Sequence, residues 1–185
     1  MKKIVARVLI AIGCIGISIT LAHAASASAD AKSIYNNAKQ AASAQYKADR
    51  VKCDSLAGNP KDVCIAETKA AEKRTDAEAE ANYKGTDSAR AAARKDIANA
   101  NYDVAKTKCD NLRGNDKDVC VAEAKSAKVA AVEDANADKK IAEARKEAAD
   151  DKRDAEYKVA TERCDALGGA AKDGCLKLVK NKFNK

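Results

Sequence analysis

The chain has no tryptophan, one phenylalanine and one methionine, so it lacks the large side chains that fill an ordinary core. Alanine supplies most of the 46% of residues that are apolar. From Ala25 onward, Leu, Ile, Val and Phe make up roughly 12% of residues, below the level typical of globular domains. A compact globule is therefore not expected. The abundant Ala, Lys, Arg and Glu are good helix formers and favour long, solvated helices.

Histidine and proline each occur once. Catalytic triads and many zinc sites need histidine, and His23 lies in a segment that we expect to be removed. The cysteines form no C-x-x-C pair, the spacing used by thiol redox enzymes and zinc knuckles. No glycine-rich nucleophile elbow is present. We therefore expect no catalytic residues, no metal and no cofactor.

Residues 1–24 have the pattern of a secretory signal peptide. A lysine-rich start precedes an apolar run from Val8 to Leu21, and the small residues Ala22 and Ala24 precede the expected cleavage between Ala24 and Ala25. Residues 25–32 are then expected to form a loose tail. The pattern implies export, with no transmembrane helix after cleavage.

Two alternatives concern the same segment. One is an N-terminal anchor that is not cleaved, although the apolar run is shorter than the roughly 20 residues that a membrane span requires. The other is a lipoprotein modified at Cys14, because Ala11-Ile12-Gly13-Cys14 loosely resembles a lipobox. The apolar run continues well past Cys14, which favours cleavage at Ala24.

The net charge of +7 falls to about +4 without Lys2, Lys3 and Arg7, and charges of both signs are interspersed along the chain. A nucleic-acid site would gather basic residues on one face with few acids between them. We expect a solvated surface and no nucleic-acid partner.

One block of sequence occurs three times, at a period of about 55 residues. Each copy keeps Tyr, Cys, Asp, Leu, Gly, Lys, Asp and Cys in the same order, with the third copy the most altered. The copies are QYKADRVKCDSLAGNPKDVCIAE from Gln45, NYDVAKTKCDNLRGNDKDVCVAE from Asn101 and EYKVATERCDALGGAAKDGCLKL from Glu156.

Each block predicts a helix, a tight turn and a second helix. In the second copy Tyr102, Cys109 and Leu112 fall on one helical stripe. Gly114 is expected to end the first helix, and Asn115 to cap the second. The first copy has Asn59 and Pro60 at the equivalent positions, whereas the third has Ala170, which offers no side-chain cap. We expect the last helix to fray most.

Two other repeated positions predict structural roles. The tyrosine seven residues before each first cysteine lies on the helical stripe and is expected to cover the hairpin seam. The aspartate after each first cysteine is assigned to the turn and its capping. These residues are Tyr46, Tyr102 and Tyr157, and Asp54, Asp110 and Asp165.

The cysteines from Cys53 onward form three C-x10-C pairs, each with a glycine turn at its midpoint. Cysteines placed symmetrically about a reversal face each other on antiparallel helices, and an exported location favours their oxidation. Each ring would contribute on the order of 3 kcal/mol in the chain-entropy account. The predicted disulfides are Cys53–Cys64, Cys109–Cys120 and Cys164–Cys175.

The linkers between repeats differ. Lys84-Gly85-Thr86-Asp87 is a helix stop followed by a new N-cap, so a reversal or kink is expected. No glycine or proline lies between Val119 and Leu167, which favours one long helix. The alternative is a break at Asp134-Ala135-Asn136-Ala137-Asp138, the weakest helix-forming stretch. The expected hairpin repeats span residues 25–85, 86–138 and 139–185.

The expected fold is all-α and elongated: three disulfide-stapled hairpins joined by long helices, as in a coiled coil or a loose bundle. The block KCDNLRGNDKDVCVAEAK, with its repeated C-D-x-L-x-G-N-x-K-D-x-C, resembles exported proteobacterial proteins rich in Ala and Lys that are often labelled TolA-like. The resemblance covers most of the mature chain. It implies a Gram-negative periplasm and a role in the cell envelope.

These observations favour a non-enzymatic structural or interaction protein, a spacer or adaptor with a protein partner in the envelope. Self-association is a further option. The alternative function is a periplasmic chaperone or envelope-stress protein that binds clients on its helical surfaces. A weaker third hypothesis is a basic protein that binds the lipid surface of the envelope. Salt would weaken such binding.

Overall fold

The computed structural model describes residues 23–185 and places their side chains from residue 29 onward. Cys14 and almost all of the predicted signal peptide lie outside these residues. The described chain is helical, with five α-helices and one 3-10 turn. They are α1 (His23–Lys52), η1 (Cys53–Ser55), α2 (Gly58–Lys84), α3 (Asp87–Cys109), α4 (Gly114–Asp165) and α5 (Gly169–Phe183).

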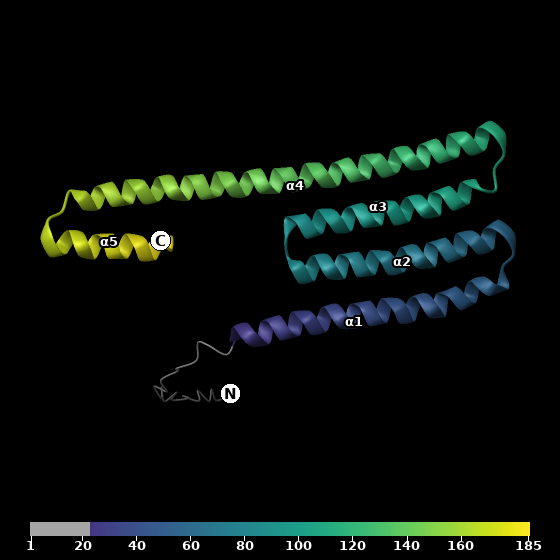
Figure 1. Ribbon diagram of the computed structural model, residues 1–185, viewed down its shortest axis with the longest axis horizontal. Helices are drawn as coiled ribbons and strands as arrows, with labels where there is room; N and C mark the ends of the chain where they lie inside the picture. Colours follow the sequence, from purple (N-terminus) through teal and green to yellow (C-terminus); the bar gives the residue numbers. More distant parts are fainter. Residues whose placement is uncertain (1–22) are drawn as a thin grey trace, which may run out of the picture.

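The helices form a single layer (Figure 1). In residues 23–185, α1 contacts α2, α2 contacts α3, α3 contacts α4, and α4 contacts α5, so every contacting pair of helices is a pair of neighbours in the chain. The α1–α2 and α3–α4 turns lie at one end of this layer, and the α2–α3 turn lies at the other. The elongated hairpins expected from the sequence are confirmed.

Alanine fills the seams between the helices. The buried residues among those described are alanines, the first cysteine of each pair, and Phe183. One cluster joins Ala77 and Ala81 of α2 to Ala93 of α3, with Ile97 packed against it. An alanine methyl removes little area from water, at about 25 cal/mol per Å². The packing between helices is therefore close but contributes only modest hydrophobic stabilisation.

The reversal between α2 and α3 has the predicted chemistry. Gly85 ends α2 in the left-handed conformation, with φ of 63°, and its N–H donates to the Ala81 carbonyl. Thr86 then caps α3, because its side-chain oxygen accepts from the Ala89 N–H at 3.1 Å. The two helices therefore fold back on one another at this point.

Helix α4 is continuous over 52 residues, which corresponds to about 78 Å at 1.5 Å per residue. The long helix favoured by the sequence is confirmed, and the alternative break at 134–138 is wrong. Its first half lies beside α3, where Arg94 pairs with Asp138. Its second half leaves the layer as an arm that carries α5 (Figure 1). The expected boundary between residues 138 and 139 therefore falls inside a helix.

The predicted loose tail at residues 25–32 is wrong, because α1 begins at His23 and runs through it. This stretch alternates alanine with serine and aspartate and contains neither glycine nor proline. Alanine favours the helix, and nothing in the segment stops it. The predicted cleavage site between Ala24 and Ala25 lies in the first turn of α1.

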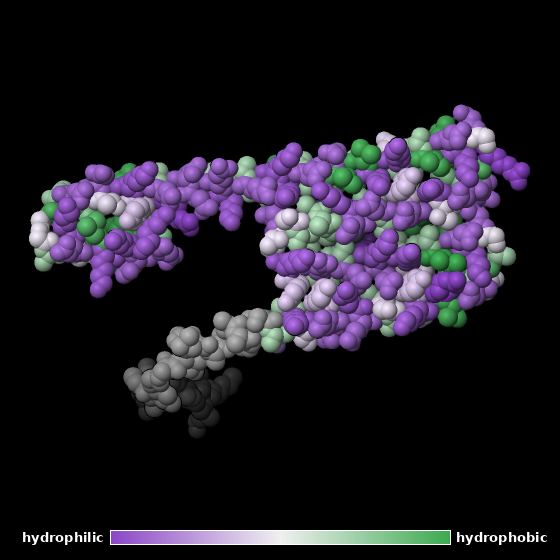
Figure 2. All heavy atoms as spheres, in the orientation of Figure 1, coloured by the Kyte–Doolittle hydropathy of each residue, from purple (hydrophilic) through white to green (hydrophobic). Residues whose placement is uncertain are grey.

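The surface between the seams is mainly polar. Figure 2 shows hydrophilic residues over most of the visible face, with small apolar patches near the turns and on the arm. In the described part of the chain, no helix is long and apolar enough to cross a membrane.

Candidate functional site: the three stapled turns

The repeat builds the same covalent site three times. Disulfides join Cys53 to Cys64, Cys109 to Cys120 and Cys164 to Cys175, and these are the pairs that the repeat predicts. The paired Cα atoms lie 5.6, 5.7 and 5.6 Å apart, a separation typical of disulfides. Each bond ties the C-terminal end of one helix, or in the first hairpin the η1 turn that follows it, to the second turn of the next helix.

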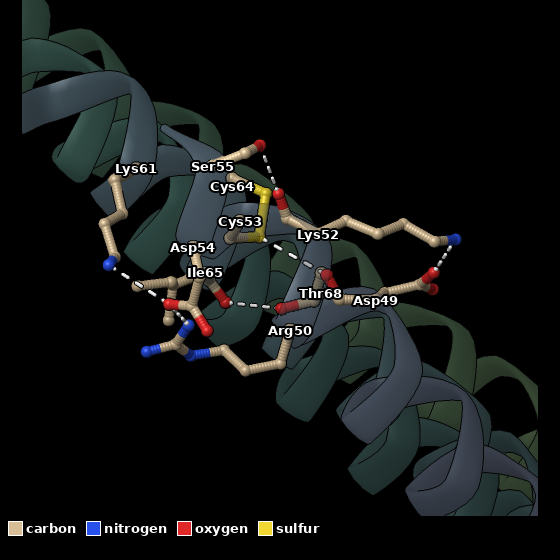
Figure 3. The surroundings of a disulfide bond; sticks show 10 residues. All are labelled: Asp49, Arg50, Lys52, Cys53, Asp54, Ser55, Lys61, Cys64, Ile65 and Thr68. Atoms are coloured by element: carbon tan, nitrogen blue, oxygen red, sulfur yellow. Dashed lines mark hydrogen bonds and ion pairs between the residues drawn. A yellow bond between two sulfur atoms is a disulfide. The ribbon is translucent and has the colours of Figure 1, made fainter. Parts of the chain in front are cut away.

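The two sulfurs of each staple have different surroundings. Cys53, Cys109 and Cys164 are fully buried, at 0% exposure. Their partners on the following helix are only half-buried. Figure 3 shows the first staple among the polar residues of its turn. The disulfide therefore supplies the apolar contact that an alanine pair could not make at the same place.

An ion pair crosses every turn beside the staple. Lys61 Nζ lies 3.1 Å from Asp54 Oδ1, and Lys117 Nζ lies 2.8 Å from Asp110 Oδ1. In the third turn Lys172 Nζ lies 3.0 Å from Asp165 Oδ1. We predicted only turn and capping roles for these aspartates. The available signal was the seven-residue spacing from aspartate to lysine, which all three copies keep.

The neighbouring cations change the acidity of two of these aspartates. Hydrogen bonds from Arg50 and then from Lys61 hold the pKa of the Asp54 carboxyl below its ordinary value. The hydrogen bond from Lys117 lowers the pKa of Asp110 in the same way. Both carboxylates are exposed, so solvent screens these interactions.

The predicted capping at the turns is wrong. Gly58, Gly114 and Gly169 do take positive φ values, of 60°, 54° and 53°, but they start the second helices and do not end the first. The residues before them are extended, and none of the three helices has a side-chain N-cap. The lack of a cap therefore does not set the third hairpin apart.

Asn59 has a different role from the expected cap. Its Nδ2 donates to the Thr107 carbonyl at 2.7 Å. Thr107 lies near the end of α3, in the second repeat. This hydrogen bond therefore joins the first stapled turn to the helix that leads into the second.

The repeated tyrosines are half-buried on their stripes, as expected for residues that cover a seam. The Tyr157 ring meets Phe183 edge-on at 5.7 Å, which closes the free end of α5 onto α4. Lys128 lies 5.1 Å from the centre of the Tyr102 ring. Lys185 lies 5.9 Å from the centre of the Tyr157 ring, so lysine side chains accompany two of the three repeated tyrosines.

A second aromatic contact lies outside the repeated block. Tyr35 of α1 stacks on Tyr83 of α2, with ring centres 5.1 Å apart. Beside them runs an open, mainly apolar groove of about 370 Å³. Ile34, on its rim, is 69% exposed. Sequence reasoning missed this pair because the two tyrosines have no counterparts in the other copies.

Among the side chains that the structure describes, residues 29–185, no group of three or more His, Cys, Asp or Glu is placed to hold a metal ion. The fold and the site define an all-helical protein of repeated hairpins, each closed by one disulfide and one ion pair. No protein-family model, curated protein or solved structure matches the chain.

Proposed function

We propose that this chain is a non-enzymatic spacer or adaptor of the Gram-negative cell envelope, working in the periplasm. The observation that carries the proposal is the arm. Helix α4 starts in the two-hairpin layer and ends at the third stapled hairpin, about 78 Å away. A helix of this length holds two surfaces at a fixed distance, which is the mechanical requirement of a spacer.

Three disulfides support an oxidising compartment, extracellular or periplasmic. The resemblance to TolA-like exported proteins favours the periplasm of the two. The exposed apolar residue Leu178, at 71% exposure on α5, offers a contact point for a protein partner on the hairpin that the arm carries.

The location is tested by trapping thiols in cells with an alkylating reagent and fractionating the envelope. We expect the protein in the periplasmic fraction, with the six cysteines from Cys53 onward unmodified. Recovery in the cytosol with alkylated cysteines would refute the proposed compartment.

The spacer role is tested by small-angle scattering and by photo-crosslinking in the periplasm. The radius of gyration should exceed the value of about 16 Å expected for a compact globule of this length. A photoreactive residue replacing Leu178 should give one reproducible product with an envelope protein, and the same residue replacing Leu112 in the layer serves as the matched control. Equal labelling of many proteins from both sites would contradict an adaptor.

The groove beside Tyr35 and Tyr83 supports a second candidate, a periplasmic chaperone. Its lining is mainly apolar and open to solvent, as a client-binding surface requires. Suppression of the aggregation of an unfolded protein, lost in Ile34→Asp and kept in Lys47→Asp, would favour this function over the adaptor. Ile34 and Lys47 both lie exposed on α1, so the pair is matched.

A further inference from the structure

The packing of α2 on α3 is the interface between the first two repeats. Its centre is the alanine cluster of Ala77, Ala81 and Ala93. Toward the stapled end, Lys108 Nζ lies 2.8 Å from Glu67 Oε1. This interface therefore contains a small-residue seam and polar contacts beside it, which include the Lys108–Glu67 and Lys73–Asp103 ion pairs.

The positions in repeats 2 and 3 that are equivalent to this interface both lie on the single helix α4. The second cysteines, Cys64 and Cys120, are 56 residues apart, so the first half of α4 corresponds to α2 with that offset. The first cysteines, Cys109 and Cys164, are 55 residues apart, so the second half of α4 corresponds to α3. The two sides of a repeat interface thus lie end to end along α4.

Four of the equivalent residues keep the same chemistry. Glu67 and Ala81 of α2 correspond to Glu123 and Ala137, whereas Ala93 and Lys108 of α3 correspond to Ala148 and Arg163. These four residues of α4 are exposed. Since helical side chains recur every 3.6 residues, they fall on one face, with Ala130, Ala144 and Ala155 between them.

This face of α4 has no partner in the described chain. Helices α3 and α5 both lie on the opposite side of α4 (Figure 1). Three of its aliphatic side chains stay about half exposed: Val119 at 47%, Ile141 at 49% and Val159 at 53%. The corresponding position to Val159 on α3 is Val104, which is half-buried beside α2.

The two halves of α4 cannot meet within one copy. Where the first linker has Gly85 and Thr86, the same offset in α4 gives Ile141 and Ala142. Both are helix formers that lack the left-handed freedom of glycine and the capping oxygen of threonine. The helix therefore stays straight, and the interface is left open.

We propose that a second copy of this chain closes the interface, with the two α4 helices packed antiparallel along their outer faces. The first half of each α4 then packs on the second half of the other copy's α4. A contact equivalent to the α2–α3 packing therefore forms twice in the dimer. The register follows from the equivalent pairs: Glu123 lies opposite Arg163 of the second copy, and Ala137 lies opposite its Ala148. Residue 143 is halfway between Glu123 and Arg163 along the chain and about halfway between Ala137 and Ala148. The two-fold axis therefore passes close to the level of Glu143.

Charge supports the same register. Ala77 and Ile97 of the first interface are replaced at the equivalent positions by Glu133 and Lys152. In the antiparallel pair these residues face each other across the two copies with opposite sign. Each copy therefore contributes an acidic and a basic partner, and a parallel arrangement would place like charges together.

Crosslinking of the native, oxidised chain tests the arrangement. Lys125 and Lys158 are about 50 Å apart along a straight α4, too far for a short lysine-reactive crosslinker within one copy. In the antiparallel pair the register brings them to nearly the same height on the two copies, within reach of the crosslinker. With a mixture of ordinary and nitrogen-15-labelled protein, we expect Lys125–Lys158 peptides that join light and heavy chains. Absence of mixed peptides at concentrations where the chain is dimeric, or a monomer at all concentrations, would overturn the proposal.

Two matched substitutions test the face itself. Ala148→Glu places a charge in the seam and should raise the dissociation constant about a hundredfold. Ala149→Glu, also exposed but off this face, should leave it unchanged. Circular dichroism should show the same helix content for both. Equal effects of the two substitutions would contradict the assigned face.

A charge exchange tests the register. Glu123→Arg alone, or Arg163→Glu alone, should weaken the dimer about tenfold, because each removes two symmetric ion pairs. The double variant restores the pairs with reversed sign and should recover the native affinity. Additive weakening in the double variant would show that these residues do not face each other.

Discussion

Lys117 Nζ lies 2.8 Å from Asp110 Oδ1 across the turn between α3 and α4, directly beside the Cys109–Cys120 staple. The covalent and ionic contacts thus close the same turn from two sides. The same two contacts recur in all three hairpins. The residues that the repeat keeps are therefore mainly those that close the turn between the two helices.

The ion pair makes the turn sensitive to acid. Because the pKa of Asp110 is lowered in the folded chain, its contribution to stability is fully present above the ordinary aspartate pKa of about 3.9 and is lost as the pH falls through the lowered value. Lys117→Gln should therefore lower the melting temperature at neutral pH and have no effect at about pH 2. Carbon-13 NMR titration should show the pKa of Asp110 rising toward the ordinary value in this variant. A difference in melting temperature that persists in acid would contradict the role of the carboxylate.

The third staple should matter more than the second for local order. Among the helices of residues 23–185, α5 packs on α4 alone, whereas α4 and α3 also contact one another along the layer. Replacing Cys164 and Cys175 by alanine removes about 3 kcal/mol of loop constraint. Hydrogen exchange should then show loss of protection confined to α5. The matched variant lacking Cys109 and Cys120 should keep protection in α3, and equal loss in both variants would argue against this account.

Two glycines should respond to alanine with opposite signs. Gly114 has a φ of 54°, so Gly114→Ala forces an unfavourable left-handed conformation and should destabilise the protein by about 1 kcal/mol. Gly174 lies within α5 with open space where a Cβ would go. Gly174→Ala should stabilise by about 0.5–1 kcal/mol, because alanine is the better helix former. Chemical denaturation measures both, and two changes of the same sign would contradict the prediction.

Helix α4 should break into two antiparallel helices if the first linker is copied into it. The double substitution Ile141→Gly with Ala142→Thr recreates the stop and the N-cap of Gly85 and Thr86. We expect α4 to reverse there, and the radius of gyration from small-angle scattering should fall. Ile141→Ala with Ala142→Ser is the control that keeps the helix. In the proposed dimer the first variant should also become monomeric, because its two half-interfaces now meet within one chain.

Much of the fold can be predicted from the sequence because the three copies of the repeat show the same pattern at equivalent positions. The cysteine spacing fixes the staples, Gly85 and Thr86 fix one reversal, and the absence of any breaker after Val119 fixes the long helix. Each of these features depends on residues close together in the chain, where propensity and geometry act directly.

The arrangement of the helices side by side could not be derived in the same way. Alanine seams such as Ala77 against Ala93 have no shape or polarity that selects one neighbour over another. The Tyr35–Tyr83 stack and the Asn59–Thr107 hydrogen bond depend on that arrangement. The caps failed for a different reason: the left-handed glycine opens each second helix, so Asn59 and Asn115 lie inside the helix and not before it.

In a layer where each helix contacts only its neighbours in the chain, no hydrophobic core is shared by all of the helices. A further hairpin added at the α5 end would need no change in any existing contact beyond one seam. The length of such a protein is therefore free to vary in whole hairpins at nearly constant stability per residue. Duplication of one hairpin can accordingly lengthen the protein without redesign of a core.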